Sequence, residues 1–112
     1  MDEDVKMDKE KSEITELLKS FKKSINTKHK IDKMILFGSI PKGTATSESD
    51  VDVILVSDEF EGKSSLKRPV PFYLEWPFRI PVDFICFTKI EFEKLKKQVS
   101  IVSEAIATGI EI

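Results

Sequence analysis

The sequence predicts an α/β fold in which a small mixed β-sheet is covered by helices on one side. Three short apolar runs, within residues 34–37, 50–56 and 82–87, have the length and the polar borders of buried strands. Apolar residues at helical spacing precede the first run, and two helix-capping sequences follow the third. Helices and strands that alternate in this way are typical of a sheet packed against helices.

The chain as a whole has the size of one domain. Its 112 residues suffice for a single core, and we expect a flexible, charged N-terminus over residues 1–11 followed by one domain over residues 12–112. A formal net charge of −2 argues against a general nucleic-acid binder. The only cysteine, Cys86, fits a reducing cytosol and is interpreted as a small core residue. No apolar run is long enough to span a membrane, so we expect a cytoplasmic protein.

The first predicted helix begins at Ser12, whose side chain can cap it. Its buried face follows the i, i+3, i+4, i+7 spacing. The members of this face are Ile14, Leu17, Leu18, Phe21 and Ile25. The lysines near its end have two interpretations: a solvated helix face and tail, which we favour, or a basic patch for RNA. These lysines are Lys19, Lys22, Lys23, Lys28, Lys30 and Lys33.

The segment between the second and third strands combines a polar loop with an aromatic cluster. Residues 57–68 are predicted to form the loop. Pro71 can start a helix of one or two turns that ends before Pro77, because proline suits only the first helical turn. The aromatic residues can stack on a base or contact a partner, but we favour the interpretation that they cover one face of the sheet. They are Phe72, Tyr73, Trp76 and Phe78.

The C-terminal part is predicted to form two helices. Thr88 and Glu91 make a capping box, which starts the first of them directly after the third strand. Ser100 is the expected cap of the second helix. Gly109 is its expected end, through the left-handed conformation that glycine tolerates. The last residues, 110–112, are expected to pack back on the domain.

Two features at neighbouring strand ends indicate the function. Gly38 and Ser39 follow the first strand and provide a tight turn whose backbone N–H groups and hydroxyl suit a phosphate. Asp50 and Asp52 open the second strand, and their spacing places both carboxylates on one face, roughly 6–7 Å apart at the backbone. Such a pair resists burial unless a cation lies between the acids, and oxygen ligands favour Mg²⁺ or Mn²⁺. Together the two features suggest a site for a nucleoside triphosphate.

The pattern Gly38-Ser39, ten residues, Asp50-x-Asp52 resembles the signature of the polymerase-β-like nucleotidyltransferases. The resemblance is greatest to the minimal nucleotidyltransferases, which are small stand-alone proteins, and it extends from the first strand to the C-terminus. It implies the nucleotidyltransferase fold and a nucleotidyltransferase enzyme. The segment 69–81 departs from the family, which has a longer helix between its second and third strands.

The resemblance also implies roles for individual residues. Asp50 and Asp52 would bridge two Mg²⁺ or Mn²⁺ ions. Asp83 is the only charge in the third strand; it matches the family's third carboxylate and would complete the metal and catalytic site. The residues expected to bind the nucleotide are Gly38, Ser39, Lys42, Gly43 and Ser49. Among them, Gly43 and Ser49 match the usual form of the signature, whereas Lys42 is equally well interpreted as a surface lysine.

The implied activity is the transfer of a nucleoside monophosphate, which we expect to be AMP from ATP, with release of pyrophosphate. A bare catalytic domain needs its acceptor surface from another protein or from a second copy in a homo-oligomer. Minimal nucleotidyltransferases typically act beside a small helical HEPN-type protein, as the antitoxin of a toxin–antitoxin pair, which implies a hydroxyl of that partner as the acceptor. The alternative is a non-catalytic module that binds nucleotide or neutralises a toxin by contact. Nucleic acid is a less favoured partner, because the sequence has no dedicated basic motif.

Overall fold

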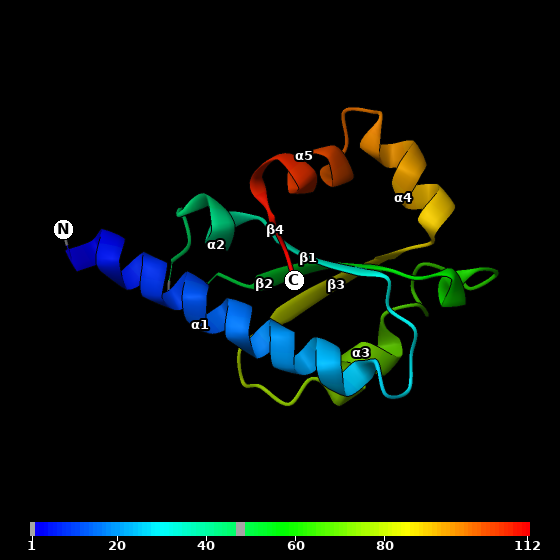
Figure 1. Cartoon of the computed structure of the whole chain (residues 1–112), viewed down its shortest axis with the longest axis horizontal. Coiled ribbons are helices and arrows are strands. Elements are labelled where there is room, and N and C mark those ends of the chain that lie inside the picture. The colour runs from blue at the N-terminus through cyan, green and yellow to red at the C-terminus, as the bar shows by residue number, and fades with distance from the viewer. Residues whose placement is uncertain (1, 47–48) are drawn as a thin grey trace.

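The computed structural model describes residues 2–46 and 49–112 and shows a four-stranded mixed sheet with the strand order β3-β2-β1-β4 (Figure 1). β1 (Lys33–Phe37) runs antiparallel to β2 (Val51–Val56) and to the short β4 (Ile110–Glu111). β3 (Val82–Phe87) runs parallel to β2. The three predicted strands and the mixed α/β class are therefore confirmed, and β4 is a strand that the sequence did not predict.

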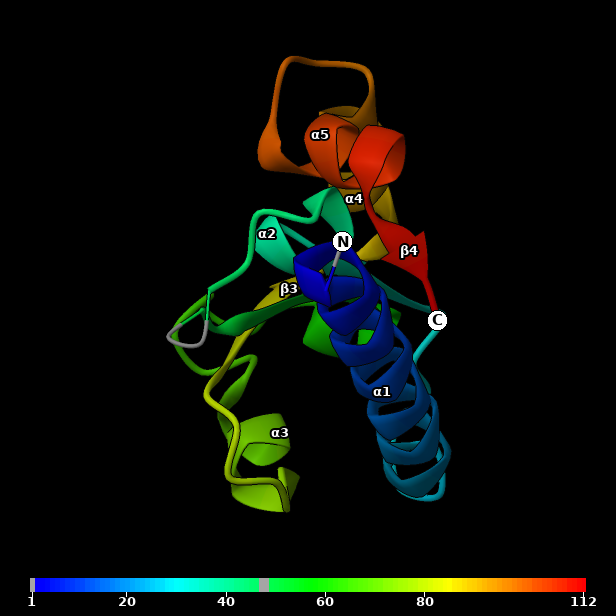
Figure 2. The same cartoon turned by 90° about the vertical axis from the view of Figure 1, so that its left-hand side faces the viewer.

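Helices cover both faces of the sheet, so the prediction of a sheet covered on one side is wrong (Figure 1, Figure 2). α1 (Asp2–Ile25) and α3 (Val70–Glu75) pack on one face. α4 (Lys89–Lys96) and α5 (Ile101–Thr108) pack on the other. The reason lies in the strands, whose neighbouring apolar residues point to opposite faces and therefore need a cover on both.

α1 begins at Asp2, well before the predicted cap Ser12, which lies inside the helix. The charged N-terminal sequence contains no Gly or Pro and is rich in Glu and Lys, which are good helix formers, so its charge does not prevent a helix. That residues 1–11 are flexible stays a prediction. The predicted apolar face is confirmed, because its central members are buried in the core under the sheet: Leu18, Phe21 and Ile25.

α3 is the short helix that the sequence predicts, with Pro71 in its first turn and Trp76 as its C-cap. Phe72 is buried beneath the sheet. Trp76 packs edge-on against Phe21 of α1, with 5.0 Å between the ring centroids. For these residues the favoured interpretation, an aromatic cover for one sheet face, is confirmed. Tyr73 differs, because much of its side chain is exposed.

Both C-terminal helices begin where the sequence predicts. Thr88 and Glu91 form the capping box of α4, and Ser100 caps α5. Gly109 follows the end of α5, but its backbone is extended (φ −88°) rather than left-handed, which corrects the expected reason for a glycine here. A Cβ at this position would lie 2.4 Å from the carbonyl oxygen of Ala105 on α5 and 2.6 Å from that of Leu36 on β1, so the lack of space between α5 and β1 is what requires glycine. Directly after Gly109 the chain forms β4, which pairs with β1. This pairing confirms that the last residues pack back on the domain.

The remaining elements are short. α2 (Ser39–Lys42) is a single turn that follows β1, and η1 (Asp58–Phe60) is a 3-10 turn within the predicted loop 57–68. Within the two described ranges, no helix is both long enough and apolar enough to cross a membrane.

Candidate active site

Three carboxylates lie together at one end of the sheet. The parallel register of β2 and β3 sets Asp52 directly beside Asp83. Asp50 comes directly before β2, and its charge acts on Asp52. Asp52 is half-buried, whereas Asp50 and Asp83 are exposed. The structure thus gathers the three predicted acids, and their catalytic roles stay predictions.

The three acids act on one another electrostatically. Burial raises the pKa of Asp52 above its ordinary value, and the negative charges of Asp83 and Asp50 raise it further. Asp83 and Asp50 are therefore close enough to disfavour ionisation of the Asp52 carboxyl. A cation placed among the three side chains would relieve this repulsion.

The chemistry of the acid cluster suits a hard divalent cation. Its side chains offer carboxylate oxygens, the ligands that Mg²⁺ and Mn²⁺ prefer. The pKa of Asp52 is raised first by burial and then by the charges of Asp83 and Asp50, and a cation at this place would offset both effects. Within residues 2–46 and 49–112, no three His, Cys, Asp or Glu side chains are already arranged as a metal-binding group. The residues fit a metal by their chemistry, and holding one would require the acid side chains to move toward it.

The predicted phosphate turn lies directly against Asp52. Gly38 has φ +85° and ψ −146°, a conformation that other residues rarely adopt. A Cβ on Gly38 would lie 2.5 Å from Asp52 Oδ2, so both the conformation and the space require glycine. Ser39 begins α2, whose first N–H groups have no acceptor within the helix. Among the described residues, no side chain caps this N-terminus either. The N–H groups expected to bind a phosphate therefore lie beside the acids expected to bind a metal.

The chain matches a known family over most of its length. Residues 18–108 match the profile of the nucleotidyltransferase domain family. The chain belongs to this family. The resemblance seen in the signature is confirmed, and the protein is a nucleotidyltransferase.

The relatives of this nucleotidyltransferase include archaeal proteins. Two proteins of Methanocaldococcus jannaschii, named as candidate protein adenylyltransferases, are 36% and 34% identical to it over 89 residues, which cover 79% of this chain and 89% of each relative. A third protein of that organism, named likewise, is 51% identical over 49 residues, or 42% of this chain and only 50% of the relative. The structure of a candidate nucleotidyltransferase from Sulfolobus solfataricus aligns with a TM-score of 0.65 at 16% identity, covering 94% of this chain and 84% of that one. The structural likeness confirms the fold.

Lys42 of this nucleotidyltransferase forms an ion pair with Glu104, a residue that the sequence analysis did not single out. Lys42 ends α2, one turn after Ser39, and its ammonium forms an ion pair with the carboxylate of Glu104 on α5. The two residues are 62 positions apart, and the contact arises only because α5 packs over β1. No sequence signal could therefore have found Glu104. Because both side chains are partly exposed, we expect the pair to be weak and open to replacement by a phosphate.

Gly43 and Ser49 shape the connection between α2 and β2. Gly43 ends α2 in the left-handed conformation (φ +77°), and a Cβ there would meet no atom of residues 2–46 and 49–112 within 4 Å. Its conformation alone therefore explains the glycine. The Oγ of Ser49 accepts a hydrogen bond from the Thr46 N–H at 2.8 Å and so fixes the chain just ahead of Asp50. That either residue binds nucleotide stays a prediction.

Cys86 is a core residue, as predicted. Its side chain is buried in the core on the face of the sheet that α1 covers. Burial raises the pKa of its thiol to about 12. A thiol of that pKa stays protonated at neutral pH, so Cys86 is not suited to act as a nucleophile.

The lysines considered as a patch for RNA are largely engaged by oxygen atoms of the domain itself. The contacts are Lys19 with Glu16, Lys28 with Glu75, Lys33 with Glu111, and Lys22 with the carbonyl oxygen of Ile112. Three of these are exposed ion pairs, which agrees with the favoured interpretation of a solvated face. The RNA interpretation gains no support from this arrangement.

Proposed function

We propose that this nucleotidyltransferase transfers AMP from ATP to a hydroxyl of an acceptor protein and releases pyrophosphate. The observation that carries the proposal is the adjacency of the acid cluster and the glycine turn: Asp52 lies beside Asp83 in the sheet and against Gly38 in space. Adenylyl transfer to a protein is further supported by the names of the relatives, which are candidate protein adenylyltransferases.

The residues of the chain supply binding and positioning. Asp50 and Asp52 would hold two Mg²⁺ or Mn²⁺ ions, with Asp83 as a further ligand, and such ions neutralise triphosphate charge and polarise the phosphoryl group when bound. The N–H groups at Gly38 and Ser39 would bind the β- and γ-phosphates, because the turn lies against the acid cluster without an intervening side chain.

Lys42 would add a positive charge next to the phosphates. Its ammonium is on the helical turn that starts at Ser39, so a phosphate bound at that turn would compete with Glu104 for it. Gly43 and Ser49 would act by holding the connection between the turn and Asp50 in shape.

In the transfer step, the hydroxyl oxygen of the acceptor attacks the α-phosphorus of ATP and forms the new P–O bond. The bond between the α-phosphorus and the oxygen that bridges to the β-phosphate breaks, and pyrophosphate leaves with that electron pair. Asp83 is the carboxylate best placed to accept the hydroxyl proton, because it is exposed and lies on β3, the outer strand of the sheet.

The acceptor that we propose is a small helical protein of the HEPN type. This protein would be the toxin of a toxin–antitoxin pair in the cytoplasm, and the present chain would be its antitoxin. The support is the resemblance to minimal nucleotidyltransferases, whose typical partner is such a protein. A second copy of the chain is the other source of an acceptor surface.

The test is mass spectrometry of a co-encoded helical protein after incubation with ATP and Mg²⁺. The wild-type chain should add AMP to this protein and release pyrophosphate, and Asp52→Ala should abolish both. Ser39→Ala should reduce transfer less, because the backbone donors of the turn survive. Glu111→Ala, which removes a carboxylate from β4 at the opposite edge of the sheet, is the control. An unmodified partner that the wild type nevertheless binds and neutralises would refute transfer and favour the non-catalytic module.

A further inference from the structure

Side chains bond two of the backbone groups at the free edge of the sheet. β3 is the outer strand, and its even-numbered residues turn their backbone groups outward because the odd-numbered ones pair toward β2. The Phe84 N–H donates a hydrogen bond to Tyr73 Oη at 3.0 Å, and Arg68 Nη1 donates one to the carbonyl oxygen of Cys86 at 3.2 Å. A partner that added a strand here would have to break these two hydrogen bonds, which favours binding through side chains.

A groove of about 450 Å³ runs along this edge between β3, α4 and the loop that precedes α3. Its lining includes the apolar side chains of Ile85, Phe87 and Leu95 and the ion pair of Arg68 with Glu91. Asp83, Ile85 and Phe87 are alternate residues of one strand and so point to the same face. The groove therefore lies on the face of β3 that carries Asp83, and it begins roughly 6–7 Å along the strand from that acid.

Large apolar side chains are exposed on the other side of the same edge. Val70, Tyr73 and Leu74 lie at i, i+3 and i+4 of α3 and therefore share one helix face. Leu66 belongs to the loop that borders the groove, and it is 87% exposed, while Leu74 is 81% exposed. Exposed apolar side chains gathered in this way are typical of interaction sites. We call this helix face, Leu66 and the groove together the β3-edge surface.

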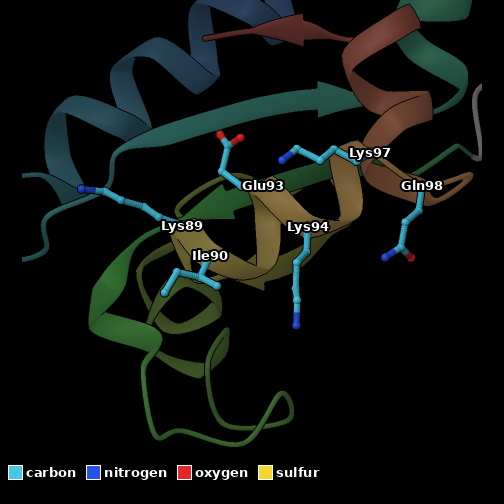
Figure 3. A pocket seen from close by; sticks show the side chains of 6 residues that line it. All are labelled: Lys89, Ile90, Glu93, Lys94, Lys97 and Gln98. Carbon is cyan, nitrogen blue, oxygen red and sulfur yellow. The ribbon is translucent and has the colours of Figure 1, made fainter.

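Lysines lie beside the β3-edge surface. Lys94 lines the groove, and Figure 3 shows it extending away from α4. Lys63 and Lys67 belong to the loop that contains Leu66. In the part of the chain that the structure describes, none of these three forms an ion pair. Charge complementarity therefore favours an acidic partner. A symmetric contact with a second copy is disfavoured, because it would bring these lysines together.

We propose that the acceptor protein docks on the β3-edge surface through a segment that combines apolar and acidic side chains and presents its hydroxyl to Asp83. Apolar side chains of this segment would cover Val70 and Leu74 and enter the groove, and its acidic side chains would pair with the lysines beside the surface. The inference rests on the proposed function, because it places the acceptor of the same reaction. It goes further by naming the surface and the chemistry of the partner.

Two synthetic copolymers serve as probes of this surface. One contains Glu and Tyr, and the other contains Lys and Tyr, so the two offer the same hydroxyl with opposite charge. Fluorescence anisotropy with the full chain and labelled copolymers measures binding. We expect the acidic copolymer to bind at least about tenfold more tightly than the basic one.

A matched pair of variants locates the binding. Val70→Glu should weaken binding of the acidic copolymer at least about fivefold, because it places a charge in the apolar part of the surface. Ile106→Glu on α5 should leave it unchanged. Val70 and Ile106 are 47% and 48% exposed, so the two changes are alike in exposure and in charge. Equal weakening by both variants would overturn the proposal, as would failure of the acidic copolymer to bind.

Charge reversal tests the lysines separately. The double variant Lys63→Glu/Lys67→Glu should lose the preference for the acidic copolymer, while Lys23→Glu/Lys30→Glu, which changes the net charge equally, should keep it. The reverse result would overturn the proposal. Metal-dependent binding of ATP, measured by calorimetry, should be the same in all these variants and in the wild type. A wild type that does not bind ATP with metal would instead refute the proposed function, so the two failures are distinguishable.

Discussion

The substitution Gly38→Ala tests whether the phosphate turn and the acid cluster work as one site. The added Cβ would lie 2.5 Å from Asp52 Oδ2, well inside van der Waals contact. The atom in conflict is the end of a side chain, so the carboxylate of Asp52 can move aside. The clash should therefore be relieved by displacing the proposed metal ligand rather than by unfolding the domain.

The expected magnitude has two parts. The backbone of Gly38, at φ +85° and ψ −146°, costs a non-glycine residue about 1–3 kcal/mol. Gly62 has φ +76°, and an added Cβ would have no atom of the described residues within 4 Å, so Gly62→Ala carries backbone strain without a clash. We expect both variants to lose stability by about 1–3 kcal/mol. Only Gly38→Ala should also weaken metal-dependent ATP binding. We expect a loss of affinity of about tenfold or more, because displacing a metal ligand or the groups that orient it has effects of this size.

Calorimetry with ATP and Mg²⁺, together with urea unfolding, measures both parts. The variants are compared at a temperature where unfolding shows each of them to be folded. If Gly38→Ala binds ATP as well as Gly62→Ala does, the contact between the turn and Asp52 has no part in nucleotide binding. The proposal that the two features form one site would then be wrong.

The other predictions concern charge and burial. Replacing Asp50 and Asp52 by Asn should leave the metal-free protein as stable as the wild type or more stable in a thermal melt with chelator, because the raised pKa of Asp52 means that its ionised form is disfavoured in the fold. A loss of about 3–5 kcal/mol would show a buried structural pair instead. Cys86, with a pKa of about 12, should react with a thiol reagent near about pH 8 only after unfolding, and rapid labelling of the native protein would contradict its burial. The hydrogen bond from Arg68 holds the pKa of Glu91 below its ordinary value, so this carboxylate stabilises the fold above its unfolded pKa, and the contribution is lost as pH falls through the folded pKa. The Glu91 side chain is 41% exposed, so solvent screening limits its contribution to the free energy of unfolding to about 0.2–1 kcal/mol. Glu91→Gln should remove this part of the pH dependence of urea unfolding. An unchanged pH dependence would refute the assignment to Glu91.

The features that the sequence predicted correctly depend on neighbouring residues. The capping box of Thr88 needs only a residue three positions ahead, and the cap at Ser100 depends on its own side chain. The ring of Pro71 likewise restricts it to the first turn of its helix. The sequence likewise predicted the phosphate turn at Gly38 and the acid at Asp52, although it did not predict the contact between them. Local rules of this kind do not depend on how the elements pack.

The features that the sequence missed depend on packing between distant segments. The ion pair of Lys42 with Glu104 exists because α5 lies over β1. Gly109 lies close to the carbonyl oxygen of Leu36 on β1 as well as to that of Ala105 on α5, and no local pattern encodes the approach to β1. The side-by-side placement of Asp52 and Asp83 follows from the parallel pairing of β2 and β3, and only the family resemblance had indicated it.

The exposure of the acid cluster explains why an acceptor protein would do more than supply a hydroxyl. Asp50 and Asp83 face solvent, and water weakens the electrostatic interactions on which phosphoryl transfer depends. α4 and α5 cover the acid-bearing face of the sheet, yet they pack over Ile54 and Val56 rather than over the acids themselves. The open side continues along β3 into the β3-edge surface. A protein docked there would exclude water from Asp83 as it delivers the hydroxyl, so recognition of the acceptor and completion of the active site would be one event.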